Sequence, residues 1–262
     1  MSSPSCPDWR RSYLDGHRAA VNSLCQGEDG SVCSGSDDGT VRLWDLRVAR
    51  SVKCILRTGP VSDVHFMGGL LYASAGNSVC AYDLRCDRVL IKEPVFSQSF
   101  DVEEISVMQT HPTANYYVIA DENGVLFIHD MKTDKFRRIQ TRKGHSSDVA
   151  SIAFAPRSRY DMVTGGYDYR CLLWDTTSSH PKREIHFRQV EQTESKVLVP
   201  PFVFNVKYIC GGHLIACALG NGNVSNLIRC RVNSYIAFRL QFFGQVWSPR
   251  LSWSLLTMTC VH

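Results

Sequence analysis

The segment at residues 37–45 constrains the fold of this chain most, because its pattern comes back later in the same sequence. The first copy reads Asp-Asp-Gly-Thr-Val-Arg-Leu-Trp-Asp, and the second, at residues 168–175, reads Asp-Tyr-Arg-Cys-Leu-Leu-Trp-Asp. A Gly-His pair precedes each copy, at residues 16–17 and 144–145. A pattern that recurs in this way is typical of stacked structural units, none of which buries its apolar face alone.

Weaker copies of the pattern lie between and after these two. Aligned on the residue pair that ends each copy, the repeats end near residues 45, 83, 130, 175 and 227. The terminal pairs are Trp44–Asp45, Tyr82–Asp83, His129–Asp130 and Trp174–Asp175, and the fifth repeat has Leu227 in place of the Trp. Within each repeat, short runs of alternating apolar residues are separated by turn residues such as Asp38–Gly39. The sequence therefore predicts an all-β chain of about five modules.

The composition changes abruptly after the fifth repeat. We assign residues 1–227 to the repeats and residues 228–262 to an atypical tail, which holds four Arg, two of the five Trp and no acidic residue. This break favours a foreign end, as from alternative splicing or read-through, and thus a shortened chain. The alternative is that residues 234–240 complete the fifth repeat as its outer strand.

Charge and composition exclude several functional classes. The net charge of +4 comes from the tail, since the rest of the chain holds 25 basic and 25 acidic residues. We therefore expect no binding to nucleic acid. No run of about 18 apolar residues is present, so no membrane partner is expected. The start of the chain lacks the apolar run of a secretory signal, which favours an intracellular protein of the cytoplasm or nucleus.

The cysteines give no sign of a metal or a disulfide framework. The chain has eleven of them, an odd number, without a Cys-x-x-Cys pair. The pattern is typical of small apolar side chains in a reducing compartment. Because zinc-ligand spacing is absent among the Cys and His residues, we expect neither a metal nor another cofactor.

Taken together, the repeats resemble those of the WD-repeat β-propeller family, and the resemblance covers residues 13–227. It is most specific in the first and fourth repeats. The resemblance implies four-stranded blades around a central channel, in a ring that the family usually closes with about seven blades. With five repeats the ring would be incomplete, so we expect an exposed apolar face and a chain that is marginally stable or prone to aggregate.

The resemblance also implies a structural tetrad of hydrogen-bonded side chains. In the first repeat it would comprise His17, Ser34, Asp38 and Trp44, and in the fourth His145, Thr164, Asp168 and Trp174. An indole N–H only donates, whereas a hydroxyl and an imidazole both donate and accept, so the four groups can form one chain of bonds. A catalytic Ser-His-Asp set is the alternative; the Trp and the duplication favour a structural network, and we predict that the chain is not an enzyme.

Repeats two, three and five depart from this tetrad. Asn123 stands at the Asp position of repeat three, and Cys217, Asn221 and Leu227 replace the tetrad residues of repeat five. We expect these repeats to depend mainly on packing and to be less stable.

Two consecutive repeats end in a longer signature. Trp44–Asp45–Leu46–Arg47 and Tyr82–Asp83–Leu84–Arg85 share the pattern Trp/Tyr-Asp-x-Arg. This box resembles the docking signature of substrate receptors of cullin-four RING ubiquitin ligases, in which the Arg contacts the damaged-DNA-binding-protein adaptor. The resemblance implies that the adaptor-docking residues are Trp44, Asp45, Arg47, Tyr82, Asp83 and Arg85.

The function expected from the sequence is therefore a protein-interaction scaffold that acts as a ligase substrate receptor. A solvated Arg at a strand end is the alternative for the box. A general WD-repeat scaffold in another complex, with no ligase role, is the alternative for the whole protein. The sequence does not name the substrate.

Overall fold

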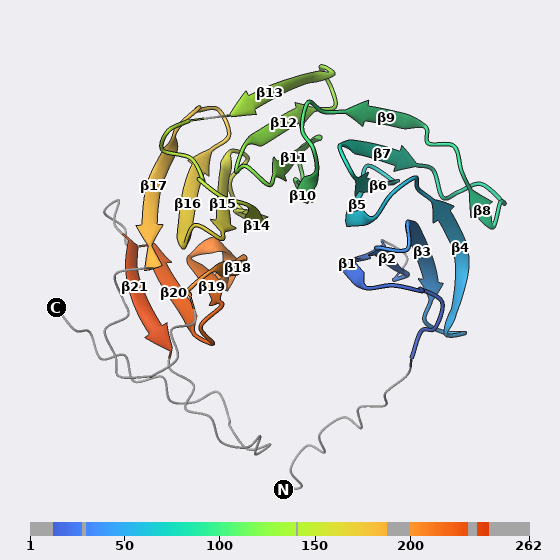
Figure 1. Cartoon of the computed structure of the whole chain (residues 1–262), viewed down its shortest axis with the longest axis horizontal. Helices are drawn as coiled ribbons and strands as arrows, with labels where there is room; N and C mark the ends of the chain where they lie inside the picture. Colours follow the sequence, from blue (N-terminus) through green and yellow to red (C-terminus); the bar gives the residue numbers. More distant parts are fainter. Residues whose placement is uncertain (1–12, 28–29, 140, 188–199, 230–234, 241–262) are drawn as a thin grey trace, which may run out of the picture.

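Each repeat of the sequence corresponds to a small antiparallel sheet. The computed structural model describes residues 13–27, 30–139, 141–187, 200–229 and 235–240, and it contains five such sheets, which we call blades one to five. The blades follow one another along an arc around an open centre (Figure 1), and the described blades leave the arc open between blade one and blade five. The expectation of an all-β WD-repeat propeller that is not closed is confirmed.

The strands run outward from the centre in sequence order within each blade. Blade one comprises β1 (Val21–Gln26), β2 (Val32–Ser36), β3 (Thr40–Asp45) and β4 (Arg50–Leu56), and blade two comprises β5 (Val61–Met67), β6 (Leu70–Ala75), β7 (Ser78–Tyr82) and β9 (Phe96–Ser99). Blade three comprises β10 (Ile105–Thr110), β11 (Tyr116–Asp121), β12 (Leu126–Asp130) and β13 (Lys135–Ile139), and blade four comprises β14 (Val149–Phe154), β15 (Asp161–Gly166), β16 (Arg170–Asp175) and β17 (Pro181–His186). Blade five comprises β18 (Val203–Ile209), β19 (Leu214–Leu219), β20 (Val224–Arg229) and β21 (Tyr235–Leu240).

Two features lie outside the pattern of the repeats. The short strand β8 (Leu90–Ile91) pairs in parallel with β4, so the connection from β7 to β9 adds a fifth strand to blade one. In blade five, β21 pairs antiparallel with β20 along its full length. Blade five therefore extends past residue 227, where composition placed the boundary, and takes the outer strand that the sequence left as an alternative. Residues 241–262 of the atypical tail lie outside the described residues.

The core consists of layers between neighbouring blades, because each sheet is apolar on both faces. Between blades one and two, the layer includes Cys33, Val41 and Ile55 from one side and Val61 and Leu71 from the other. Equivalent layers lie at each of the following junctions. Trp174 is 1% exposed in the layer between blades three and four. This arrangement makes each blade dependent on its neighbours for burial.

A β-bulge recurs near the start of every inner strand. The register shifts occur at residues 21–23, 61–63, 105–107, 149–151 and 203–205. A bulge bends the strand and turns one side chain out of the regular alternation. In blades one, two and four, the residue just after the register shift (Ser23, Asp63 and Ser151) contacts the inner strand of the next blade.

These bulge side chains link successive blades by hydrogen bonds. The amide of Val64 donates to Ser23 Oγ, and the amide of Val206 donates to Ser151 Oγ, both over 3.2 Å. The amide of Met108 donates to Asp63 Oδ2, also over 3.2 Å. At the remaining junction the bulge residue is Val107, whose side chain has no acceptor atom. We call these bonds the interblade links.

Candidate functional site

In blade one, the four predicted tetrad residues form one continuous chain of hydrogen bonds. Trp44 Nε1 donates to Ser34 Oγ over 2.8 Å, and Ser34 Oγ lies 2.7 Å from His17 Nε2. His17 Nδ1 lies 3.0 Å from Asp38 Oδ2. Because the indole can only donate, the hydroxyl donates its own proton to Nε2, and His17 donates from Nδ1 to the carboxylate.

Blade four repeats this chain with nearly the same distances. Trp174 Nε1 donates to Thr164 Oγ1 over 2.8 Å, Thr164 Oγ1 lies 2.7 Å from His145 Nε2, and His145 Nδ1 lies 3.0 Å from Asp168. The Thr164 hydroxyl is 0% exposed and already accepts the indole proton. The hydroxyl is thus occupied within the blade, as a structural network requires, and is not presented to a substrate.

Asp168 of blade four is held by several donors at once. It accepts from the amide of Ser146 over 3.0 Å and pairs with Arg170 over 2.7 Å. Burial alone would raise the pKa of Asp168, but the hydrogen bond from His145, with the Ser146 amide and the charge of Arg170, lowers it to about 2. The folded state therefore favours the ionised carboxylate.

This shift predicts a loss of stability in acid. A carboxyl group whose pKa is depressed by folding stabilises the protein above its unfolded pKa of about 4 and loses that contribution as the pH falls toward about 2. At pH 6 we expect the free energy of unfolding of the wild type to exceed that of Asp168→Asn by about 2 kcal/mol. This difference should become smaller below pH 4. Urea unfolding of both proteins between pH 6 and pH 2.5 measures this, and a difference that is independent of pH would contradict it.

Blades two and three contain polar networks of their own, in addition to the packing on which the sequence predicts that they mainly depend. In blade two, Arg57 donates to Ser78 Oγ over 2.8 Å, to Cys80 Sγ over 2.6 Å and to Tyr82 OH over 3.3 Å. An Arg from the preceding loop thus occupies the role that the imidazole has in blades one and four. Sequence reasoning missed it because Arg57 follows β4 and shows no local motif.

In blade three, the imidazole itself stands at the position of the Trp. His129 Nδ1 lies 3.0 Å from Tyr117 OH, and His129 Nε2 lies 3.1 Å from Asp134 Oδ1. The turn that the sequence assigned to Asn123 is held instead by Asp121, whose Oδ1 accepts from the amides of Asn123 and Val125. These contacts replace the tetrad with different chemistry at the same places in the sheet.

The two Asp-x-Arg boxes have nearly the same geometry. Arg47 donates to Asp45 through its amide over 2.9 Å, through Nε over 3.0 Å and through Nη2 over 2.7 Å. Arg85 makes the same three bonds to Asp83, over 3.0, 2.9 and 2.7 Å. The side chains of Arg47 and Arg85 are 88% and 82% exposed. The hydrogen bonds from these side chains lower the pKa of both aspartates to about 2.

The box residues lie at equivalent places in adjacent blades. Asp45 and Asp83 lie at or just after the ends of β3 and β7, which are the third strands of blades one and two. Both Arg side chains therefore lie at the same rim of the arc. Trp44 and Tyr82 do not join them on the surface, since they are 2% and 1% exposed. The structure thus places the aromatic residues in the core and the Arg side chains of the boxes at the surface.

Blades three and four show which part of the box belongs to the turn. Asp130 accepts from the amide of Lys132, and Asp175 accepts from the amide of Thr177, each over 2.9 Å. The Asp therefore closes the same turn in four blades, as short polar side chains commonly do. An Arg two residues later is present in blades one and two alone of these four, so it is not required by the turn.

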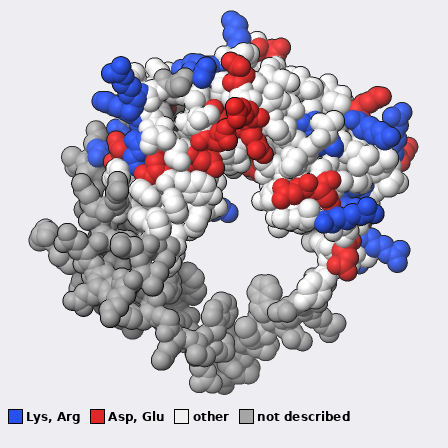
Figure 2. Space-filling view, viewed as in Figure 1, with Lys and Arg blue, Asp and Glu red and all other residues white. Residues whose placement is uncertain are grey.

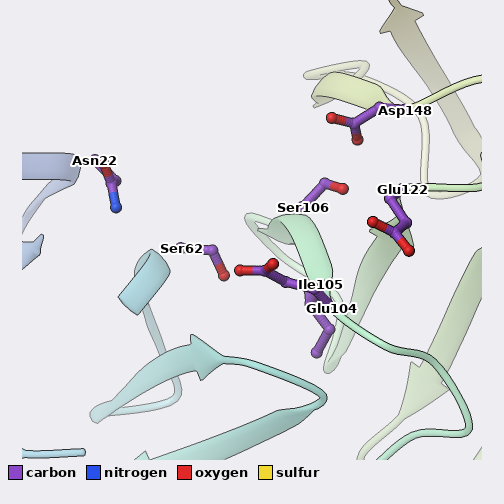
Figure 3. Close-up of a pocket in the computed structure, with 7 residues that line it drawn as sticks. All are labelled: Asn22, Ser62, Glu104, Ile105, Ser106, Glu122 and Asp148. Atoms are coloured by element: carbon purple, nitrogen blue, oxygen red, sulfur yellow. The ribbon is translucent and has the colours of Figure 1, made fainter. Parts of the chain in front are cut away.

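A second surface feature, which the sequence did not predict, lies at the inner rim. A cavity of about 390 Å³ is lined by Asn22, Ser62, Glu104, Ile105, Ser106, Glu122 and Asp148 (Figure 3). Partial desolvation, with the charges of Glu103, Asp121 and Glu104, raises the pKa of Glu122. Figure 2 shows acidic side chains gathered near the inner rim on the face in view. The cavity favours a cationic or hydrogen-bond-donating group over an anion.

The described residues form no group of three or more His, Cys, Asp or Glu side chains placed to hold a metal ion. Nor does any helix among them have the length and apolar character needed to cross a membrane.

Comparisons with known proteins agree with this architecture. The family model described as "WD domain, G-beta repeat" matches residues 10–45 and 136–175, the regions that contain the two tetrads. The chain is 28% identical to the WD repeat-containing protein 53 homolog of Dictyostelium discoideum over 80% of its own length and 62% of that protein. It is 27% identical to Nuclear distribution protein PAC1 of Arthroderma otae over 70% of its length and 41% of that protein.

Human Striatin-3 is a third relative, 28% identical over 72% of this chain and 25% of that protein. The chain thus spans less than two thirds of the length of each of these relatives. The matched segments carry the repeated turn, the tetrad and the Trp-Asp ending, and the structure arranges them as successive blades. These observations together show a chain that carries WD repeats and is similar to WD-repeat β-propeller proteins in sequence and in the arrangement of its blades.

Proposed function

We propose that this chain is a protein-interaction scaffold that serves as a substrate-receptor subunit of a cullin-four RING ubiquitin ligase. In this proposal Arg47 and Arg85 contact the damaged-DNA-binding-protein adaptor, inside the cell, in the cytoplasm or nucleus. The observation that carries the proposal is the pair of exposed Asp-Arg units with the same three hydrogen bonds at one rim of two adjacent blades.

The geometry of these units suits docking to a protein. A guanidinium is planar and offers five donors, which matches carboxylates and backbone carbonyls on a partner. The aspartate holds each guanidinium in one orientation before the partner arrives, which reduces the conformational entropy lost on binding. Arg is also among the residues that most often dominate the energy of an interface. Client proteins would bind elsewhere on the blades.

The alternative is a general WD-repeat scaffold without a ligase role. The Asp of the box also closes the turns of blades three and four, where no Arg follows. This observation favours a structural role for the Asp. The Arg is therefore the residue that distinguishes a ligase receptor from a general scaffold.

The test is recovery of the purified adaptor on the immobilised full chain. We expect the Arg47→Ala/Arg85→Ala double variant to bind at least about tenfold more weakly than the wild type, since each Arg of a hot spot contributes 2 kcal/mol or more. Arg88→Ala is the matched control, because Arg88 is also exposed and lies three residues beyond the second box. Equal recovery of the adaptor with wild type and double variant, or no recovery with either, rejects the receptor role and leaves the general scaffold.

A further inference from the structure

Two cysteines of blade one lie directly opposite each other on neighbouring strands. Cys25 of β1 is the register partner of Cys33 of β2 in the antiparallel ladder. Both side chains are on the face that packs against blade two, where Cys33 belongs to the core layer and Cys25 packs against it. Opposite residues of an antiparallel pair have Cα atoms about 4.5–5.5 Å apart. A disulfide spans about 4.4–6.8 Å between Cα atoms, so the backbone already meets its main requirement.

The two thiols differ in access to solvent. Cys33 is 0% exposed, whereas Cys25 is partly exposed. An attacking thiol needs access to solvent, and a resolving thiol needs only to reach the first sulfur. The structure therefore supplies one thiol of each kind.

The surroundings of Cys25 favour its thiolate. The hydrogen bond with the Cys33 thiol, and to a smaller extent the charge of His65, lower the pKa of Cys25, although burial opposes this. Burial alone would lower the pKa of His65, but its interaction with the Asp63 carboxylate, 3.3 Å away, raises it. A thiol beside a second thiol and an imidazole with a raised pKa matches the setting of reactive cysteines.

Other cysteines of the described chain provide a contrast. Cys171 and Cys217 also interact with each other, between blades four and five, but both are 0% exposed. The interaction with Cys217, together with burial, raises the pKa of Cys171 well above its ordinary value. Cys54 is partly exposed like Cys25, but burial raises its pKa. Neither of these places combines access with a favoured thiolate.

We propose that Cys25 and Cys33 form a reversible dithiol site that hydroperoxides, such as hydrogen peroxide, convert to a disulfide. The Cys25 thiolate attacks one oxygen of the peroxide, the O–O bond breaks, and the hydroxide that leaves takes up a proton to become water. Cys25 is then a sulfenic acid. The Cys33 thiolate attacks the Cys25 sulfur, the S–S bond forms and the S–O bond breaks. The second hydroxide leaves as water with a proton, so two thiols lose two electrons and the peroxide gains them.

The sequence makes this disulfide easy to detect. Cys25 and Cys33 lie in one tryptic fragment, between Arg18 and Arg42, and Glu28 and Asp29 separate them. After oxidation of the full chain with hydrogen peroxide and blocking of free thiols, cleavage at acidic residues divides the fragment. We expect Cys25 and Cys33 peptides that remain joined until a dithiol reductant is added. A second probe is phenylarsine oxide, which bridges two adjacent thiols with loss of one water, and we expect one such adduct on the same pair.

Three variants separate the proposal from general oxidation. Cys25→Ser and Cys33→Ser should each abolish the joined peptides and the arsenical bridge at this place, whereas Cys54→Ser should leave both unchanged. In the wild type, Cys25 should react with iodoacetamide at least about three times faster than Cys54, as its thiolate is favoured. If Cys25 is oxidised without joining Cys33, joins another cysteine instead, or is no more reactive than Cys54, the proposal is wrong. If a variant fails to fold, the joined peptides, the arsenical adduct and the reactivity of Cys25 in the wild type still test the proposal.

Discussion

Trp174→Ala is expected to lower the free energy of unfolding by about 3–5 kcal/mol, the usual range for truncating a buried aromatic residue. The indole is 1% exposed and belongs to the core layer shared by blades three and four. Its removal leaves a cavity between the two blades and deprives Thr164 Oγ1 of its donor. Equilibrium urea unfolding followed by circular dichroism measures the change.

The equivalent substitution in blade one provides the comparison. Trp44 makes the same hydrogen bond, to Ser34. Its ring meets the segment around Gly16, where an added Cβ would lie 2.9 Å from Cη2, and an edge of His17. Because a loop yields more readily than a neighbouring sheet, we expect Trp44→Ala to cost less than Trp174→Ala. Equal costs would show that the hydrogen bond, and not the packing between blades, accounts for the effect.

Asp63→Ala is expected to be the most costly substitution on the inner strands, at about 2–4 kcal/mol. One carboxylate connects three blades: it accepts from the Ser23 hydroxyl of blade one, from the amide of Val64 over 2.9 Å and from the amide of Met108 in blade three over 3.2 Å. Alanine deprives the Met108 amide and the Ser23 hydroxyl of this acceptor, while the amide of Val64 keeps its bond to Ser23 Oγ. Each buried group left unpaired costs about 1–3 kcal/mol. Equilibrium unfolding by heat and by urea, for the wild type and the variant, measures the change in the free energy of unfolding.

Graded variants test the cause of this loss. Asp63→Asn keeps one acceptor oxygen and should recover part of the stability. Ser151→Ala removes a single interblade link, the bond from the amide of Val206, and should cost about 1 kcal/mol. Asp87→Ala, at an exposed position, is the control for loss of a negative charge. If Asp63→Ala costs no more than Ser151→Ala, the carboxylate does not connect the blades energetically.

The sequence predicts those parts of the fold that are specified by short motifs of adjacent residues. The Asp38–Gly39 turn, the Trp-Asp endings and the Gly-His pairs are local signals, and they placed blades one and four and the tetrads. Gly39 has φ of +75°, as the hairpin turn requires, whereas blade four has Tyr169 at the corresponding place with φ of +65°. The repeat is therefore recognisable even where the preferred turn residue is absent.

The parts that the sequence does not predict depend on residues brought together from distant segments. Arg57 reaches the strand that carries Ser78 and Tyr82, and the acidic cavity at the inner rim draws on Asn22, Glu104 and Asp148 from different blades. The interblade links need the bulge in each inner strand, which shifts the register by one residue and has no sequence motif of its own. The sequence gives the outer strand β21 only as an alternative, because its residues share the unusual composition of the following segment.

The interblade links also give the row of blades a direction. At each linked junction the acceptor side chain comes from the earlier blade and the donating amide from the later one. If blade one detached, the amide of Val64 would lose Ser23 but keep its bond to Asp63 within blade two, over 2.9 Å. If blade five detached, the Ser151 hydroxyl left behind could rotate toward water. A terminal blade at either end could therefore unfold without leaving an amide of these links unpaired on the blades that remain, so the links allow local unfolding at both ends of the arc.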